Sequence, residues 1–340
     1  MRVRLHRDNG DLWAIDAEGL HFWRGSFERW KARRPVGRDE NTGFVNAILR
    51  ARNGRLWLET GGGLAVEEAD GAFRTIREIL GRTLTTVTGL AEDRTGGIWV
   101  SSGGAFAGAY RWDGRAWTWF GPAQGLEAVR VHAIVPDRQG DLWFLGLDSL
   151  PNNAGPGAFQ WDGSRFTRWG PAEGMPVSRV YAFAEAPDGT RWFGAVNGLA
   201  RWRSGQWTHW PASNEGPMRR VYALTTDSTG RPWFGMWASG GGLGTVDPDD
   251  RLRWIPTGFE GAGEVASLAW GADGGLWFGT TGGLGRMVNG VVAMLGRESG
   301  LRPPRLWPVL PLTDRVLAGG DGLFTLDLDE LTLPPPRVEV

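Results

Sequence analysis

A short phrase built around a Leu-Trp pair returns along the whole chain. It reads GDLWAIDAEGLHF at 10–22, GRLWLETGGGLAV at 54–66 and GGLWFGTTGGLGR at 274–286. Aligning the copies gives one anchor residue per copy: Trp13, Trp57, Trp99, Trp143, Trp192, Trp233, Trp277 and, in a degenerate last copy, Leu317. Successive anchors lie 40 to 49 residues apart. This period is typical of the blades of a β-propeller, whereas helical repeats would show a 3.6-residue hydrophobic pattern.

Each copy divides into four short segments with the character of β-strands. In the copy around Trp143 they are VHAIV at 131–135, LWFLG at 142–146, GAFQW at 157–161 and RFTRW at 165–169. Turns that carry glycine separate them, as in β-hairpins. We interpret the first segment as strand A, nearest the axis of a ring, and the last as strand D, at its rim. A sheet this small buries its faces only by stacking against neighbouring blades.

The repeat therefore predicts an all-β fold, a single β-propeller of four-stranded blades over residues 1–333. We count eight copies, so eight blades are the first expectation. Seven blades with one stray copy from a neighbouring propeller are the alternative. Most of the 21 Trp recur at fixed places in strands B, C and D. We expect these side chains to fill the space between blades, and we predict no cofactor.

Composition narrows the classes of partner and chemistry. The 37 Lys and Arg balance 38 Asp and Glu, so nothing in the charge predicts binding to nucleic acid or to an anionic membrane. The chain has no Cys, which excludes disulfides, thiolate metal sites and a Cys nucleophile. The first residues, MRVRLHRDNG, lack the apolar segment of a signal peptide. No apolar run is long enough to cross a bilayer, so we expect no membrane insertion.

The repeat resembles the two-component regulator propeller repeat. GLEAVRVHAIVPDRQGDLWFLG at 125–146 and LWFGTTGGLGR at 276–286 follow its pattern closely. In that family such propellers form the periplasmic or extracellular sensing part of hybrid histidine kinases and related regulators, and many sense polysaccharide breakdown products. The resemblance implies a periplasmic or extracellular sensor, and it is compatible with a homodimer in a full-length receptor. It also implies that residues 334–340 begin a linker to an immunoglobulin-like domain.

One column of the alignment predicts a ligand site at the axis. The residue before the first Val of strand A is an arginine in four copies: Arg130, Arg179, Arg220 and Arg305. The residue after that Val varies and is polar or aromatic in most copies, with Asn46, His132, Tyr181, Tyr222 and Trp307 as the candidates. Trp237, in a connection from strand B to strand C, joins them as a ligand platform or as a plug against the next blade.

These residue types suit a sugar or a small anion. Arginine binds carboxylate or sulfate through two parallel hydrogen bonds, and Tyr and Trp offer flat faces to sugar rings. We therefore predict a sensor that binds an oligosaccharide or another small ligand, anionic ones included, at the top of the central channel. The competing interpretation is that the arginines are solvated or paired with nearby acids, for which the candidates are Glu127, Glu173, Glu215 and Glu298.

Two other classes of function stay open. A protein-interaction platform would use the same fold, and exposed loops such as 147–157 could serve it. A propeller lyase or glycoside hydrolase needs a paired acid and base or a metal site. Of the four His, only His132 is expected near the axis, and one His makes a poor metal site. We therefore predict no catalytic residue, no metal and no enzymatic activity.

Overall fold

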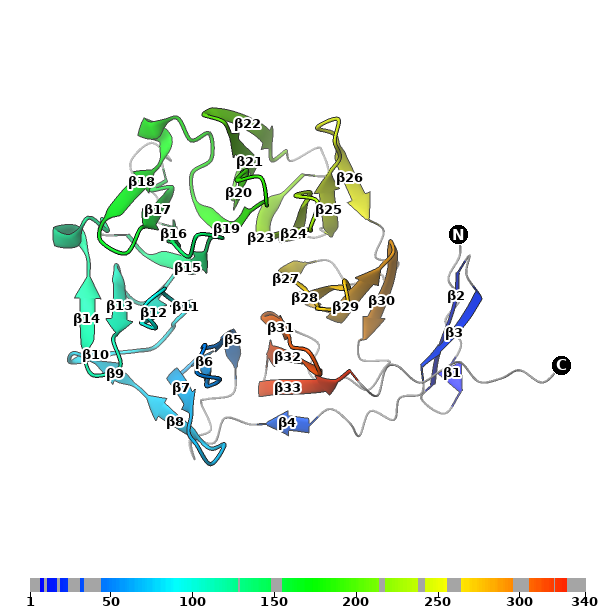
Figure 1. Cartoon of the computed structure of the whole chain (residues 1–340), viewed down its shortest axis with the longest axis horizontal. Helices are drawn as coiled ribbons and strands as arrows, with labels where there is room; N and C mark the ends of the chain where they lie inside the picture. The colour runs from blue at the N-terminus through cyan, green and yellow to red at the C-terminus, as the bar shows by residue number, and fades with distance from the viewer. Residues whose placement is uncertain are drawn as a thin grey trace.

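Seven four-stranded sheets stand around a central channel in the computed structural model of the chain (Figure 1). The described residues are 44–328 without 128, 148–154, 214–217, 238–241, 256–263, 296–305 and 321, and before residue 44 the backbone of four strands only. The all-β propeller of four-stranded blades is confirmed. Eight blades are wrong, and the seven-bladed alternative holds.

The first four blades in chain order follow one antiparallel up-and-down pattern. They consist of β5 (Val45–Arg50), β6 (Leu56–Thr60), β7 (Gly63–Glu67) and β8 (Phe73–Ile76); β11 (Gly89–Glu92), β12 (Ile98–Ser101), β13 (Ala109–Trp112) and β14 (Trp117–Phe120); β15 (Val131–Pro136), β16 (Leu142–Gly146), β17 (Ala158–Trp161) and β18 (Phe166–Trp169); and β19 (Val180–Glu185), β20 (Arg191–Ala195), β21 (Gly198–Arg203) and β22 (Gln206–Pro211).

The other three blades complete the ring with the same strand order. They consist of β23 (Arg220–Thr226), β24 (Pro232–Trp237), β25 (Leu243–Val246) and β26 (Leu252–Ile255); β27 (Val265–Trp270), β28 (Leu276–Thr280), β29 (Gly283–Val288) and β30 (Val291–Leu295); and β31 (Val309–Pro311), β32 (Arg315–Gly320), β33 (Gly322–Asp327) and β4 (Lys31–Arg33). Two short strands, β9 (Glu78–Ile79) and β10 (Arg82–Thr83), and two 3₁₀ turns, Pro122–Gln124 and Pro171–Glu173, lie in the connections.

The ring closes by joining the two ends of the chain. Strand β4 pairs with β33, in the register Leu323 to Arg33, so a strand from the N-terminal part becomes the outer strand of the last blade. The other strands of the first repeat copy, β1 (Arg7–Asp8), β2 (Asp11–Asp16) and β3 (Gly19–Trp23), form a three-stranded sheet of their own beside the ring (Figure 1). The first copy therefore contributes one strand to the ring instead of a blade, which accounts for the seven.

Within the blades, the sequence predicted the strands almost to the residue. The four segments expected around Trp143 are β15 to β18 with end points shifted by one residue at most. The anchor side chains from Trp57 to Trp277 and Leu317 are buried, and Trp143 is fully enclosed. Trp13 lies in β2, outside the residues whose side chains the structure describes.

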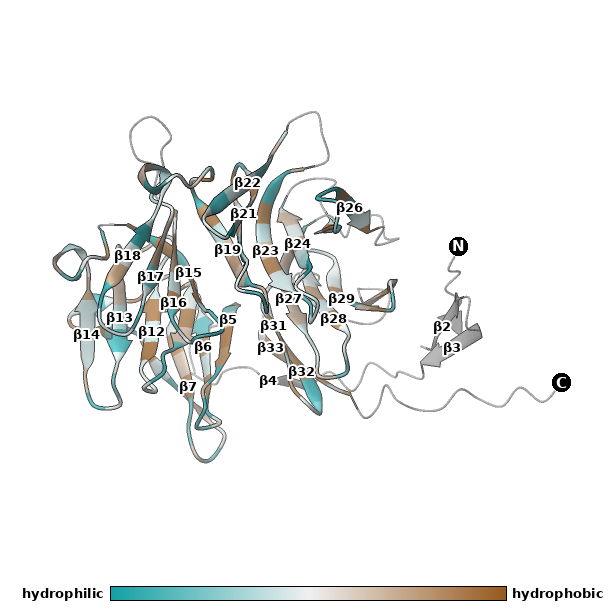
Figure 2. Ribbon diagram, turned by 45° about the horizontal axis from the view of Figure 1, so that its top comes forward, coloured by the Kyte–Doolittle hydropathy of each residue, from teal (hydrophilic) through white to brown (hydrophobic). Residues whose placement is uncertain are grey.

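Aromatic and aliphatic side chains fill the space between neighbouring blades. In one such cluster Trp99, from β12, packs against Phe144 and Phe159 of the next blade. Figure 2 shows hydrophobic residues along many strands, and hydrophilic residues in turns and in outer strands such as β22. No helix in the described part of the chain is long and apolar enough to cross a membrane.

Candidate ligand site in the central channel

The strands nearest the axis carry a repeated irregularity. Five of them, β5, β15, β19, β23 and β27, contain a β-bulge directly after their first valine. A bulge inserts one residue that has no partner on the neighbouring strand and turns its side chain out of the regular alternation. The bulge residues are Asn46, His132, Tyr181, Tyr222 and Ala266, and all five line a cavity in the channel.

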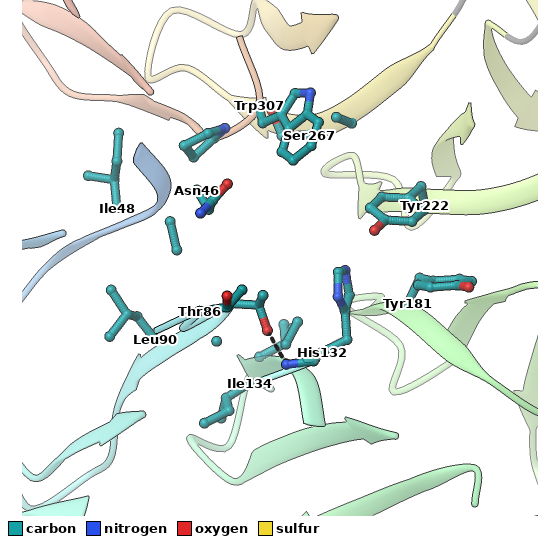
Figure 3. A pocket seen from close by; sticks show the side chains of 18 of the residues that line it. Asn46, Ile48, Thr86, Leu90, His132, Ile134, Tyr181, Tyr222, Ser267 and Trp307 are labelled. Atoms are coloured by element: carbon teal, nitrogen blue, oxygen red, sulfur yellow. Dashed lines mark hydrogen bonds between the residues drawn. The ribbon is translucent and has the colours of Figure 1, made fainter. Parts of the chain in front are cut away.

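This cavity has a volume of about 620 Å³ and takes its wall from all seven innermost strands or the residues just before them. Its floor is aliphatic, with Ile48, Leu90 and Ile134 on three neighbouring blades (Figure 3). Trp307, before β31, stands across the opening from His132 (Figure 3). A volume of this size suits a ligand of a few rings.

Aromatic side chains form a continuous line of contacts along the wall. Each member lies within 5.4 Å of the next, measured between ring centroids, and the two tyrosines are stacked at 4.7 Å. The line covers five of the seven blades. Its members, in order, are Phe44, Trp307, Trp237, Tyr222, Tyr181 and His132.

The line of rings crosses one blade by means of a small residue. Ala266 is the bulge residue of the blade β27–β30, and it leaves room for Trp237 to reach Trp307, 5.3 Å away between centroids. Trp237 is the last residue of β24 and also contacts Tyr222. Trp237 thus lies in strand B and not in the connection from strand B to strand C, and it is not among the described residues that line the cavity. Its role as a ligand platform or as a plug stays a prediction.

The described residues that line the cavity carry no charged side chain. His132 does not add one at neutral pH, because burial lowers the pKa of its imidazole to about 4. Burial, with a smaller contribution from Tyr181, raises the pKa of Tyr222 to about 12, although Arg220 acts in the opposite direction. Both groups are therefore neutral near pH 7, and the cavity offers hydrogen-bonding groups and ring faces without net charge.

Two polar atoms of the wall have no hydrogen-bond partner among the described residues. They are the indole nitrogen of Trp307 and the hydroxyl oxygen of Ser267, and both are buried. The two side chains lie next to each other in Figure 3. Buried polar groups in proteins are nearly always paired with protein, water or ligand. The Trp307 N–H can only donate, whereas the Ser267 hydroxyl can donate and accept, so together they match a hydroxyl or a carbonyl of a bound molecule.

A buried carboxyl group stands behind one wall residue. Glu59, in β6, is fully buried, and Asn46 approaches it from the channel side. Neither carboxyl oxygen accepts a hydrogen bond of ordinary geometry from the described residues. Burial raises the pKa of Glu59 to about 8, against weaker opposing contributions from Asn46 and the Val87 backbone.

Glu59 was missed by reading the column of strand A alone, although the sequence carries a signal for it. In three other blades the residue at this place of strand B is Gly194, Gly235 or Gly279. A Cβ at Gly235 would stand 2.5 Å from Val265 of the next blade, so the position normally has no room for a side chain. A glutamate at this position indicates that the interface with the next blade leaves room for a side chain.

The three predicted arginines that the structure describes do not line the cavity. Arg130 and Arg220 are exposed and Arg179 is half-buried, each directly before the valine that precedes a bulge. The bulge turns the residue after the valine inward. The arginine before the valine stays at the start of the strand, toward the outer end of the channel. Of the three, Arg220 is close enough to Tyr222 to act on its pKa. Arg305 lies outside the described residues.

Of the acids proposed as partners for these arginines, the described ones pair elsewhere. Glu127 and Glu173 both approach Arg168, at 2.7 Å and 3.8 Å between the closest nitrogen and oxygen atoms. Glu215 and Glu298 lie outside the described residues. The rest of the predicted column, from Asn46 to Trp307, lies together at the cavity, and the binding role of these residues stays a prediction.

Comparison with known proteins places the fold among sensor and enzyme propellers. The chain is similar to the extracellular domain of the two-component system protein BT4673 from B. thetaiotaomicron, with a TM-score of 0.69 and 17% identity over 87% of this chain and 39% of that one. It is also similar to the extracellular domain of BT3049 from the same organism, with a TM-score of 0.54 and 16% identity over 99% of this chain and 59% of that one.

An enzyme shares the architecture. Virginiamycin B lyase from Staphylococcus aureus has a TM-score of 0.68 and 15% identity, over 88% of this chain and 99% of the lyase. No family model matches the sequence, and no curated protein is detectably related to it in sequence. The resemblance to two-component propellers is thus confirmed as a likeness of fold, and this chain spans about two fifths of the BT4673 domain.

Proposed function

We propose that the chain is a sensor propeller that binds a neutral oligosaccharide, or a small ligand of similar chemistry, at the central channel. The observation that carries the proposal is the wall itself: a line of aromatic rings along an uncharged cavity of about 620 Å³. Aromatic faces pack against the apolar faces of sugar rings, and hydroxyl and amide groups between them bond to sugar hydroxyls.

The polar groups of the wall fit this ligand class. Asn46, Ser267 and Trp307 offer donors and acceptors without charge, and two of them have unpaired buried atoms. The arginines at the strand starts add positive charge outside the cavity, where an acidic substituent of a longer ligand would lie. The likeness to extracellular domains of two-component systems supports a location outside the cytoplasm and a role in signalling.

The lyase neighbour favours a second candidate, an enzyme that uses the same channel. The described residues contain no group of three side chains suited to hold a metal ion. His132 is the one described histidine in the wall, and His209 lies in β22, where its ring contacts the backbone carbonyl of Asn197 at 3.2 Å. More of the described residues of the wall therefore suit ligand binding than suit catalysis.

A panel of neutral and acidic glycans, screened by thermal shift with product analysis of every hit, separates the candidates. We expect neutral oligosaccharides to raise the melting temperature and to be recovered intact. A hit that is recovered cleaved or eliminated would make the chain an enzyme. A panel without hits would contradict glycan binding and favour a protein-interaction platform.

A further inference from the structure

The turns between strands A and B share one backbone conformation in six blades. Its first residue donates its N–H to the carbonyl four residues later, as Asp93 does to Gly97 at 2.9 Å and Ala186 does to Thr190 at 2.8 Å. The same first residue accepts a hydrogen bond from the residue three positions on. The side chain at this place can therefore be compared from blade to blade.

In the blade β11–β14 this place holds a carboxylate with a full set of donors. Asp93 accepts hydrogen bonds from the indole nitrogen of Trp99 at 2.8 Å and from Nε of Arg111 at 2.6 Å. The backbone of Thr95 and Gly97 adds two more, each at 2.9 Å. Burial alone raises the pKa of Asp93, but these donors outweigh it and hold the pKa well below its usual range.

The blade β19–β22 keeps the two side-chain donors and lacks the carboxylate. Trp192 and Arg201 pair across strands B and C in the same register as Trp99 and Arg111. The first residue of the turn, however, is Ala186. The indole nitrogen of Trp192 and Nε of Arg201 are both buried and have no partner among the described residues, and Trp192 is 3% exposed.

The two residues that carry these donors border a cavity of about 470 Å³ between the blades β19–β22 and β23–β26. Trp192 and Arg201 line it, together with Gly230, where an added Cβ would lie 3.4 Å from the Cβ of Ala186. Its wall comes from the turns that follow strands A and C. Because strand A runs from the channel site to this turn, the cavity opens on the opposite face of the propeller.

Three arginines and three aspartates line this cavity, and one of the arginines has no acidic partner among the described residues. Asp250 pairs with Arg201 and Asp188 with Arg203, while Asp247 pairs with Arg253 from outside the wall. Arg231, the third arginine of the wall, makes no ion pair within the part of the chain that the structure describes. The guanidinium of Arg201 also lies over the Trp192 ring, 5.5 Å from its centroid.

We propose that this cavity binds the carboxylate of a small organic acid, which takes the place that the Asp93 side chain has in the blade β11–β14. One carboxylate oxygen would accept from the indole N–H of Trp192 and from Nε–H of Arg201. The site is separate from the channel and does not depend on the function proposed for it.

A third blade shows why the site is specific to this place. In the blade β27–β30 the indole nitrogen of Trp277 and Nε of Arg286 are unpaired too, and Gly271 begins the turn. There, however, Asp273 forms an ion pair with Arg286. A Cβ at Gly271 would lie 2.6 Å from an Asp273 carboxyl oxygen, so a carboxylate of the chain already occupies that space.

Acetate is the probe, and the reporter is the indole N–H resonance of Trp192, assigned by its loss in Trp192→Phe. At constant ionic strength, with chloride exchanged for acetate, we expect this resonance to move downfield and to saturate. In Ala186→Asp we expect the Trp192 resonance to lie downfield already without acetate and to stay there when acetate is added. Asp93→Ala should create a matched site, in which the Trp99 resonance gains an acetate response absent from the unmodified chain.

A Trp192 resonance that stays in place in acetate would overturn the proposal and assign the space to water. A linear drift without saturation that is equal in the unmodified chain and in Ala186→Asp would overturn it as well. Because the unmodified chain gives the first result, the test stands even if one variant does not fold.

Discussion

At the scale of single residues, Glu59 is a carboxyl group whose burial changes its protonation. It is a fully buried carboxyl whose pKa burial raises to about 8. In the unfolded chain the same group would titrate near its ordinary value, so between about pH 4.5 and pH 8 the folded state binds more protons. The contribution of Glu59 to the free energy of unfolding therefore decreases as the pH rises through this window, and levels off above it.

Replacing this group by its uncharged isostere should remove that dependence. We expect Glu59→Gln to gain stability relative to the unmodified chain as the pH rises from 5 to 8, by about 1.4 kcal/mol per pH unit at most. Denaturant unfolding at several pH values measures the difference in the free energy of unfolding between the variant and the unmodified chain. The titration of His132 cancels in this difference because both chains contain it. Glu78→Gln, at an exposed strand position, is the control. Parallel stability curves for Glu59→Gln and the unmodified chain would show that Glu59 is ionised in the fold.

Substitution of the arginines at the strand starts tests whether the charge of a ligand affects its affinity for the channel. Because neither Arg179 nor Arg220 lines the cavity, we expect the double variant Arg179→Ala with Arg220→Ala to change the affinity for a neutral glycan less than about fivefold, as charges near the surface contribute at most about 1 kcal/mol. An acidic glycan should lose more affinity, and only at low salt. Calorimetric titration at two salt concentrations measures both. A large, salt-independent loss with the neutral glycan would place the arginines in the site.

At the scale of elements, the sequence predicts strands well and their partners less well. Strand boundaries follow from the local pattern around each anchor, which is why β15 to β18 match the expected segments. The pairing of β4 with β33 joins residues almost the whole chain apart, and no local pattern encodes it. Eight sequence copies could close as eight blades or as seven with a shared last blade.

Two truncations separate the strand that closes the ring from the sheet beside it. A chain that starts at residue 25 loses β1 to β3 and keeps β4, and we expect its melting temperature to stay close to that of the full chain. A chain that starts at residue 41 also loses β4 and leaves β33 as an unpaired edge, so it should melt earlier and associate through that edge. Equal melting of the two truncated chains would contradict closure by β4.

At the scale of the whole molecule, the ring explains which parts of the candidate site the sequence could predict. A column of the repeat that varies inside a constant frame predicts residues with the same place on every blade, and from Asn46 to Trp307 that column lines one cavity. The column of arginines is equally regular, but bulges inside the strands decide which column turns inward. Bulges depend on pairing with the next strand, so the single segment does not reveal them.

The central claim is that the channel cavity holds the ligand, and blocking the cavity tests it most directly. Ala266 lines the cavity at a bulge, so Ala266→Trp puts a large side chain into the open space, and Ala266→Ser is the matched control. The measurement is the calorimetric affinity for a glycan that stabilises the unmodified chain. The account predicts that a folded Ala266→Trp variant loses binding, while the affinity of Ala266→Ser stays nearly unchanged. Full affinity in a folded Ala266→Trp variant would contradict it.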